Sequence, residues 1–260
     1  MKVKNLKPNI QIAEYVERLL IIENSQSNDS FSLPLFANGS PTLLFISPKA
    51  IMGNKAASHL TLFGQTLFPD TLTFTGGFTL IAYFLKPYSL NAIFGVMAPE
   101  LTDSPIDLGS VKPKKAGILE LQLLNAKSTN QMLLLLDQFI SGLIADARCD
   151  CPGIRYAANK IAEQPTPKIL GRVQNELHIT ERTFQRMFEK NIGISPNLYR
   201  RVCQFNSAFQ QLNNRHFSKL SDLAFHNGYA DQSHFVRAFK EFTHLLPTEY
   251  LDLGEPPEAQ

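Results

Sequence analysis

The stretch TERTFQRMFEKNIGISPNLY, residues 180–199, returns in similar form as DQSHFVRAFKEFTHLLPTEY, residues 231–250. An offset of 51 residues superposes two phenylalanines, an arginine, a proline and a tyrosine of the first copy on the same residue types in the second. The pairs are Phe184 with Phe235, Arg186 with Arg237, Phe188 with Phe239, Pro196 with Pro247 and Tyr199 with Tyr250. Such a pattern rarely arises by chance, so we infer two copies of one supersecondary unit.

Helical spacing gives each copy one apolar and one polar face, because residues at i, i+3, i+4 and i+7 share a side of a helix. The polar face of the first copy consists of Arg182, Gln185, Arg186 and Glu189. The matching positions of the second copy are Ser233, Val236, Arg237 and Lys240. The repeated phenylalanines lie on the apolar faces. Thr180 and Asp231 are suited to be N-caps, so each helix is predicted to begin directly after a turn.

A further helix is predicted before each copy, over LGRVQNELHI (170–179) and LSDLAFHNGYA (220–230). In the second, Ala224 and Gly228 supply a small residue at a helix contact and a glycine in the turn, as a helix-turn-helix requires. A basic, amide-bearing helix after such a turn fits the major groove, where Arg pairs with guanine and Gln with adenine. The alternative is that each polar face is the solvated side of an ordinary helix.

Charge supports the first interpretation. Residues 155–250 hold 13 basic and 8 acidic side chains, a net charge of +5, whereas residues 1–154 hold 12 of each. The last ten residues hold three acidic side chains and no basic one, which brings the whole chain to +2. The basic helical part therefore suits a polyanionic partner.

Over residues 155–253 the sequence resembles the DNA-binding domain of the AraC/XylS family of bacterial transcription regulators. A Gly-aromatic turn, S-H-F, R-x-F-K and P-x-x-Y follow in order in LSDLAFHNGYADQSHFVRAFKEF (220–242) and LPTEY (246–250). The resemblance implies two helix-turn-helix units joined by a long helix, with double-stranded DNA and RNA polymerase as partners. The base- or phosphate-facing positions that it implies are Arg182, Gln185 and Arg186 in the first unit, and Gln232, Ser233 and Arg237 in the second.

The connecting helix, expected over residues 196–213, would be roughly 27 Å long at about 1.5 Å per residue. With the flanking units, that length places the two recognition helices about one DNA turn apart, roughly 34 Å. Basic residues around this helix are candidates for phosphate contacts, or else solvated surface charges. They are Arg200, Arg201, Lys190 and Lys219, with Lys240 on the second recognition helix.

Some residues depart from the family pattern. Gln174 and His178 stand where the family usually has a small residue and Gly, which predicts a distorted first turn. Gln204 replaces the usual Arg of the connecting helix, and His244 replaces a Gly before the final Pro.

The N-terminal part has short β-like segments about a dozen residues apart between residues 31 and 98, typical of an antiparallel barrel or sandwich. We expect helices over residues 10–22 in front of it, over 89–97 behind it, and over 128–144, within a helical part that spans 118–148. The last of these either packs on its own β-domain or forms a dimerisation seam with a second chain. In the AraC/XylS family such a region is often cupin-like.

The predicted fold is therefore two-domain α+β: a β-rich regulatory or dimerisation domain over residues 1–150, and a C-terminal all-α double helix-turn-helix domain over 155–253. Its predicted function is sequence-specific transcription regulation in response to a small-molecule effector. The alternative is a ligand-independent regulator whose N-terminal domain mediates homodimerisation or binds another protein.

Other classes of function are disfavoured. His59 is the sole histidine before residue 178, too few for a metal-dependent cupin enzyme, so we expect no metal, no cofactor and no enzymatic activity. His59 and Tyr83 are candidates to line a pocket, or else structural residues. Cys149, Cys151 and Cys203 make no disulfide framework, which indicates a cytoplasmic protein with ordinary thiols. No apolar run is long enough to cross a membrane, and the N-terminus has no signal peptide pattern.

Overall fold

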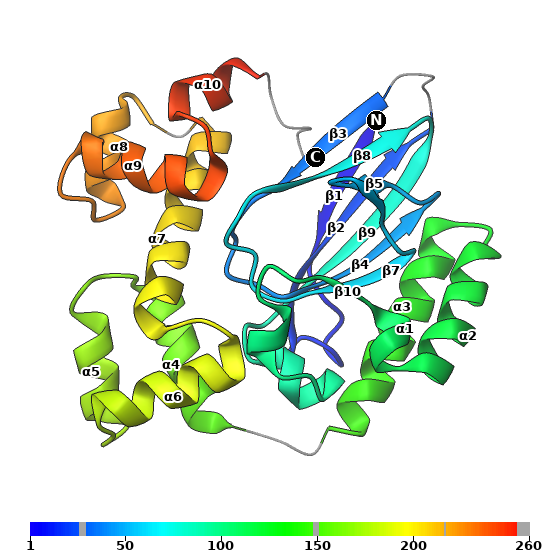
Figure 1. The fold of residues 1–260 in the computed structure, drawn as a ribbon, viewed down its shortest axis with the longest axis horizontal. Coiled ribbons are helices and arrows are strands. Elements are labelled where there is room, and N and C mark those ends of the chain that lie inside the picture. The colour runs from blue at the N-terminus through cyan, green and yellow to red at the C-terminus, as the bar shows by residue number, and fades with distance from the viewer. Residues whose placement is uncertain (26–29, 148–150, 216, 254–260) are drawn as a thin grey trace.

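The computed structural model describes residues 1–25, 30–147, 151–215 and 217–253. An antiparallel β-domain with helices along one side forms the N-terminal part, and every element from Pro152 onward is a helix (Figure 1). Among the described residues, no helix is long and apolar enough to cross a membrane. Cys151 and Cys203 are not joined by a disulfide, and Cys149 lies outside the described residues.

Two antiparallel sheets build the N-terminal domain. The larger has, in spatial order, β1 (Lys2–Leu6), β2 (Val16–Asn24), β9 (Phe78–Leu85), β4 (Thr42–Ser47), β7 (Leu60–Phe63) and β10 (Ile106–Asp107). The smaller has β3 (Ser30–Leu35), β8 (Asp70–Thr75), β5 (Ile51–Met52) and β6 (Lys55–Ala56). Of the two predicted arrangements, the sheets form the sandwich and not a closed barrel.

Both faces of the larger sheet are covered, which explains its nearly continuous apolar strands. Along β9, Leu80 and Ala82 pack in the core against the smaller sheet, whereas Ile81 and Tyr83 pack in the core against the helices. Successive side chains of a strand point to opposite faces, so a strand buried on both sides is apolar at every position. The same strand therefore holds together both layers of the domain.

The helix predicted over residues 10–22 is wrong, because Val16–Asn24 form β2, paired with β9 along its length. Leu19 and Ile21 pack toward the helices, and Ile22 packs toward the smaller sheet. A run of large apolar residues satisfies both a helix and a doubly buried strand, and periodicity alone does not separate the two. Pairing with β9 makes this segment a strand.

Helices of the N-terminal domain partly follow the prediction. Behind β9 there is one π-helical turn, η1 (Leu90–Phe94), then the 3₁₀ turn η2 (Ala98–Leu101). The short α1 (Leu108–Val111) leads into α2 (Pro113–Leu124) and α3 (Thr129–Ala145). Ser128 Oγ accepts from the Gln131 amide at the start of α3, and α3 packs on its own β-domain through buried Leu136, Ile140 and Leu143.

Among the described residues, seven helices lie beyond residue 151, and they include every helix predicted there from the sequence. They are α4 (Pro152–Glu163), α5 (Ile169–Glu176), α6 (Glu181–Ile192), α7 (Pro196–Asn213), α8 (Leu220–His226), α9 (Gln232–Thr243) and α10 (Pro247–Asp252). The phenylalanines of the repeat are buried, which confirms the predicted helix faces.

The two halves share one hydrophobic core near the start of α7. Ile192, Ile194 and Tyr199 pack in the same apolar cluster as Leu90 and Phe94. A second contact lies further along α7, where Phe36 meets the rings of Phe209 and Tyr250 at 5.5 and 6.0 Å between centroids. The β-domain therefore touches the helical part at both ends of α7 (Figure 1).

A candidate nucleic-acid interface on two helix-turn-helix units

Two helix pairs of the same kind lie at the ends of α7 (Figure 1). In the first, residues 177–180 connect α5 to α6, and in the second, residues 227–231 connect α8 to α9. Each second helix begins at the predicted cap. Thr180 Oγ1 accepts from the Thr183 amide at 3.3 Å, and Asp231 Oδ1 accepts from the His234 amide at 2.7 Å. Both candidate recognition helices are thus fixed at their N-termini by the residue that the sequence indicates.

The predicted distortion of the first turn takes a mild form. His178 adopts φ 52°, the left-handed conformation that Gly228 adopts in the second unit at φ 73°. The first turn is also shorter by one residue. A non-glycine residue in this conformation costs roughly 1–2 kcal/mol, and histidine tolerates it better than most residues. The first unit therefore closes at an energetic cost, with its recognition helix still exposed.

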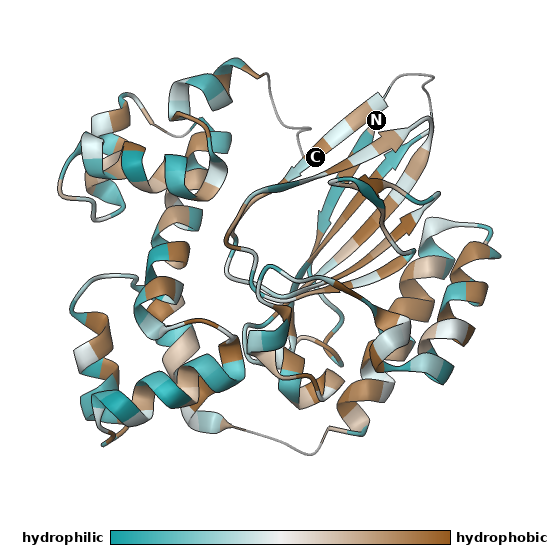
Figure 2. Cartoon of the chain, viewed as in Figure 1, coloured by the Kyte–Doolittle hydropathy of each residue, from teal (hydrophilic) through white to brown (hydrophobic). Residues whose placement is uncertain are grey.

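Polar side chains cover the outer faces of α6 and α9, and Figure 2 shows hydrophilic residues alternating with hydrophobic ones along both helices. The exposed residues from the sequence prediction are Arg182, Gln185, Arg186 and Lys190 on α6, and Gln232, Ser233, Arg237 and Lys240 on α9. Val236, also placed on the polar face, is half-buried. Within the described part of the chain, Arg182 and Arg186 form no ion pair, so both cations face solvent ready for an anionic partner.

Arg200 does not belong to this surface, which corrects the sequence prediction. Its side chain is buried, and its Nη1 donates to the Pro165 carbonyl at 3.1 Å and to Gln204 Oε1 at 3.0 Å. Burial lowers the pKa of its guanidinium, and the charge of neighbouring Arg201 lowers it further. A phosphate cannot reach a group that is enclosed and already bonded in this way, so Arg200 is structural.

Arg201 is half-exposed and paired. Its guanidinium forms an ion pair with Glu241 of α9 and lies 5.7 Å from the ring centroid of Phe242. Lys219 is exposed and precedes α8. A contact of Arg201 with DNA would therefore compete with the Glu241 carboxylate, whereas Lys219 has no such competitor among the described residues.

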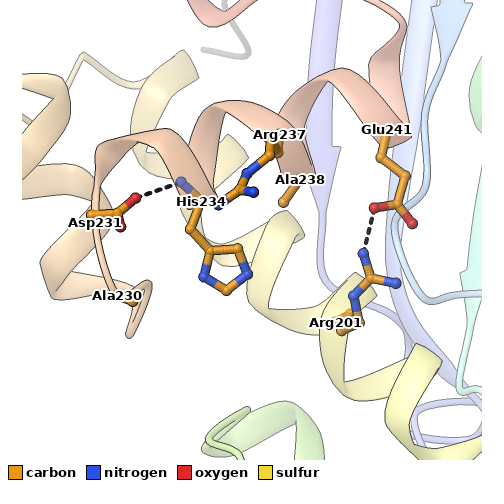
Figure 3. A pocket seen from close by; sticks show the side chains of 7 residues that line it. All are labelled: Arg201, Ala230, Asp231, His234, Arg237, Ala238 and Glu241. Carbon is orange, nitrogen blue, oxygen red and sulfur yellow. Dashed lines mark hydrogen bonds and ion pairs between the residues drawn. The ribbon is translucent and has the colours of Figure 1, made fainter.

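A shallow pocket of about 360 Å³ lies between α7 and α9 (Figure 3). Its lining residues are Arg201, Ala230, Asp231, His234, Arg237, Ala238 and Glu241. Arg237 Nε makes one long hydrogen bond, 3.4 Å, to the Ser233 carbonyl, so its terminal nitrogens stay available. His234, which the sequence prediction of site residues missed, is exposed beside Arg237. Its place in S-H-F, one turn before Arg237, is the signal that would have found it.

The two candidate pocket residues of the β-domain serve structural roles. His59 Nδ1 bonds the Ile46 carbonyl at 2.8 Å. The buried Tyr83 hydroxyl donates to Asp137 Oδ1 at 2.7 Å and to the Leu133 carbonyl at 3.3 Å, which ties β9 to α3. Desolvation raises the pKa of the Asp137 carboxyl, although the tyrosine hydrogen bond lowers it in part.

Comparison with known proteins agrees with this geometry. Residues 174–252 match a family model described as a helix-turn-helix domain, and residues 4–107 match a domain of unknown function, DUF6597. A search of the curated proteins finds no match.

Solved structures of ToxT from Vibrio cholerae have a similar fold. One at 1.65 Å resolution is 14% identical in sequence, covers 90% of this chain and 97% of that chain, and has a TM-score of 0.50. A wild-type ToxT with bound unsaturated fatty acid is 12% identical, covers 100% of this chain and 96% of that chain, and has a TM-score of 0.50. At these identities the likeness concerns the fold alone: an N-terminal β-domain followed by two helix-turn-helix units.

Proposed function

Since this chain belongs to the AraC/XylS family through its C-terminal helix-turn-helix domain, we propose that it is a sequence-specific DNA-binding transcription regulator. One observation carries the proposal: two capped helices, each with an exposed basic and amide-bearing face, stand at the two ends of one connecting helix. The 18 residues of α7 span about 27 Å, which suits two successive major grooves on one side of a duplex.

In this proposal some residues of each unit contact bases and others contact phosphates. Base edges are read by Arg182, Gln185 and Arg186 of α6, and by Gln232, Ser233 and Arg237 of α9. Phosphates are held by Lys190, Lys219, Lys240 and Arg201. Arginine and glutamine supply the bidentate pairs that distinguish guanine and adenine, whereas lysine contacts fix the position of the protein without reading sequence. RNA polymerase as a partner and a cytoplasmic location follow from the same proposal.

Selection of bound duplexes from a random library by the full chain tests the function. We expect an enriched site with two preferred segments about 10 base pairs apart, and an affinity that falls by about 100-fold or more between 50 and 200 mM salt, because neutralised phosphates release counterions. Absence of enrichment, or an affinity that does not change with salt, would contradict the proposal. Replacing exposed Lys49 and Lys55 of the β-domain by Gln is the control, and it should leave the salt dependence unchanged.

We further propose that the β-domain binds an acidic effector with an apolar body. The fatty-acid-bound ToxT has this fold, and Arg18 of β2 offers a suitable cation. Its guanidinium carbon lies 3.5 Å from the ring centroid of Phe84. Burial lowers the pKa of Arg18, although the charge of Glu17 partly opposes this, and no carboxylate pairs with it among the described residues. A partly desolvated guanidinium without a carboxylate partner favours an acid ligand.

A specific observation supports the alternative of a dimerisation module. The outer side of α2 exposes large apolar side chains: Ile118 at 60%, Leu121 at 65% and Leu124 at 42% of their surface. These residues follow helical spacing, so a second copy of the chain would cover them along one stripe.

One set of samples separates the two roles. If the effector proposal holds, oleate at about 100 times its Kd should stabilise the full chain by about 2.7 kcal/mol in thermal unfolding. Arg18→Met should lose this effect and the exposed-lysine control Lys4→Met should keep it. Absence of any shift, together with a molar mass near twice 29.2 kDa that Leu121→Glu halves, would favour the dimerisation module instead.

A further inference from the structure

Three polar side chains of α7 lie along one stripe that faces inward between the helix-turn-helix units. Arg200 and Gln204 are buried, and Gln211 is half-buried. Burying a charge and two amides in a helical core is costly unless each group finds partners. Their partners lie in the connection that leads into the first unit, between α4 and α5, and at the turn of the second unit, so the stripe is a physical link between the two.

At one end the link reaches the segment that leads into α5 of the first unit. Arg200 Nη1 donates to the carbonyl of Pro165, which precedes α5, and its Nε donates to Asn197 Oδ1 at 3.3 Å. The same Nη1 donates to Gln204 Oε1 at 3.0 Å. All of these acceptors are neutral, and among the described residues no carboxylate pairs with Arg200. The buried guanidinium is therefore held by direction-dependent hydrogen bonds and not by an ion pair.

At the other end the link reaches the turn of the second unit. Gln204 Nε2 donates to the Asn227 carbonyl at 2.9 Å. Asn227 ends α8, and its side-chain amide exchanges two hydrogen bonds with Gln211, of 3.2 and 3.1 Å, while also donating to the Leu223 carbonyl at 2.9 Å. Because the turn that follows leads directly into α9, the side chain of Gln204 fixes the base of the second recognition helix.

We propose that Gln204, together with Arg200, is a positioning residue that fixes the rotation of the second helix-turn-helix unit about α7, and so sets the base-pair spacing between the two DNA segments. This inference rests on the proposed DNA-binding function. Packed phenylalanines hold each unit against α7, yet apolar contacts tolerate small rotations. Hydrogen bonds to one carbonyl before α5 and one at the end of α8 tolerate much less, because they weaken steeply as their angles change.

The test uses Gln204→Met in the full chain, which keeps the side-chain length and removes both hydrogen bonds. Gln210→Met is the matched control, because Gln210 lies exposed on the same helix. Affinity is measured on duplexes with the selected spacing and with one base pair inserted or deleted between the segments, a shift of about 3.4 Å and roughly 35°. For the wild type and Gln210→Met we expect affinity to fall at least about tenfold on either altered duplex. Two units held in a fixed orientation cannot both contact their bases when the spacing changes.

For Gln204→Met the loss should shrink to about threefold or less, while base preference inside each segment stays as in the wild type. If that variant shows no cooperative melting, Gln204→Glu replaces it. The carboxylate keeps the acceptor for Arg200 and loses the donor to Asn227, and we expect the same relaxation.

A folded variant that keeps the full tenfold spacing penalty would overturn the inference, and would assign the spacing to the apolar core or to the β-domain contacts. Relaxation in Gln210→Met as well would also overturn it. If the wild type selects no two-segment site at all, the proposed function itself falls, and this inference falls with it.

Discussion

Replacing Phe239 by Ala is expected to lower the free energy of unfolding by about 3–5 kcal/mol, the cost typical of removing a fully buried aromatic ring. Phe239 is completely buried, and its ring centroid lies 5.8 Å from those of Phe205, Phe235 and Tyr250. These rings come from α7, α9 and α10, so the cavity would open at the centre of the second unit. Chemical unfolding followed by circular dichroism measures the loss.

Arg237→Ala is the matched control, two residues away on the same helix. Arg237 is exposed, and its one hydrogen bond within the described structure is the long one to the Ser233 carbonyl. Its removal should change the unfolding free energy by no more than about 0.5 kcal/mol. Equal destabilisation by the two substitutions would show that the faces of α9 are assigned wrongly.

Gly193→Ala is expected to cost about 2–5 kcal/mol, which adds a left-handed backbone strain of about 1–2 kcal/mol to an overpacking term of about 1–3 kcal/mol. Gly193 ends α6 at φ 96°. A Cβ there would lie 2.8 Å from the Ala98 carbonyl oxygen and 2.8 Å from Thr102 Oγ1, both in the β-domain. Thr102 Oγ1 also donates to the Gly193 carbonyl at 3.1 Å, so the clash falls on an interdomain contact.

The repeat provides the control for this substitution. His244 stands 51 residues after Gly193 and ends α9 with the same left-handed conformation, at φ 61°. It is exposed, so a Cβ is tolerated where no second domain approaches. His244→Ala should change stability by about 0.5 kcal/mol or less. If the same unfolding experiment gives a similar cost for both substitutions, the close contact with the β-domain is not the reason why position 193 requires glycine.

The helical part could be predicted from sequence because its signals are local. Caps such as Thr180 and Asp231 and the repeated phenylalanines fix where α6 and α9 begin and which face is buried. His244 stands where the family usually has Gly, and this too is explained locally. A residue at the C-terminal end of a helix can be left-handed without being glycine when it is exposed.

Features that depend on distant contacts could not be predicted. Residues 16–24 form a strand because β9 pairs with them, and nothing in their own spacing excludes a helix. Arg200 stands next to Arg201 in a basic domain, a pattern that predicts phosphate binding, yet its side chain is buried and bonded to the Pro165 carbonyl, 35 positions away. The need for glycine at position 193 likewise comes from another domain, because the Ala98 carbonyl of the β-domain leaves no room for a Cβ there. In each case the deciding partner lies far along the chain.

Selection of bound duplexes by the wild type, Arg186→Ala and Arg237→Ala in parallel tests whether α6 and α9 read separate segments of one DNA site. If α6 and α9 enter neighbouring major grooves, each substitution should relax base preference in its own segment by about 1–3 kcal/mol and leave the other segment intact, with the segments about 10 base pairs apart. The strained first turn at His178 leads us to expect the cleaner effect from Arg237→Ala. Relaxation of the same base positions by both substitutions, or of none by either, would show that α6 and α9 do not enter neighbouring major grooves.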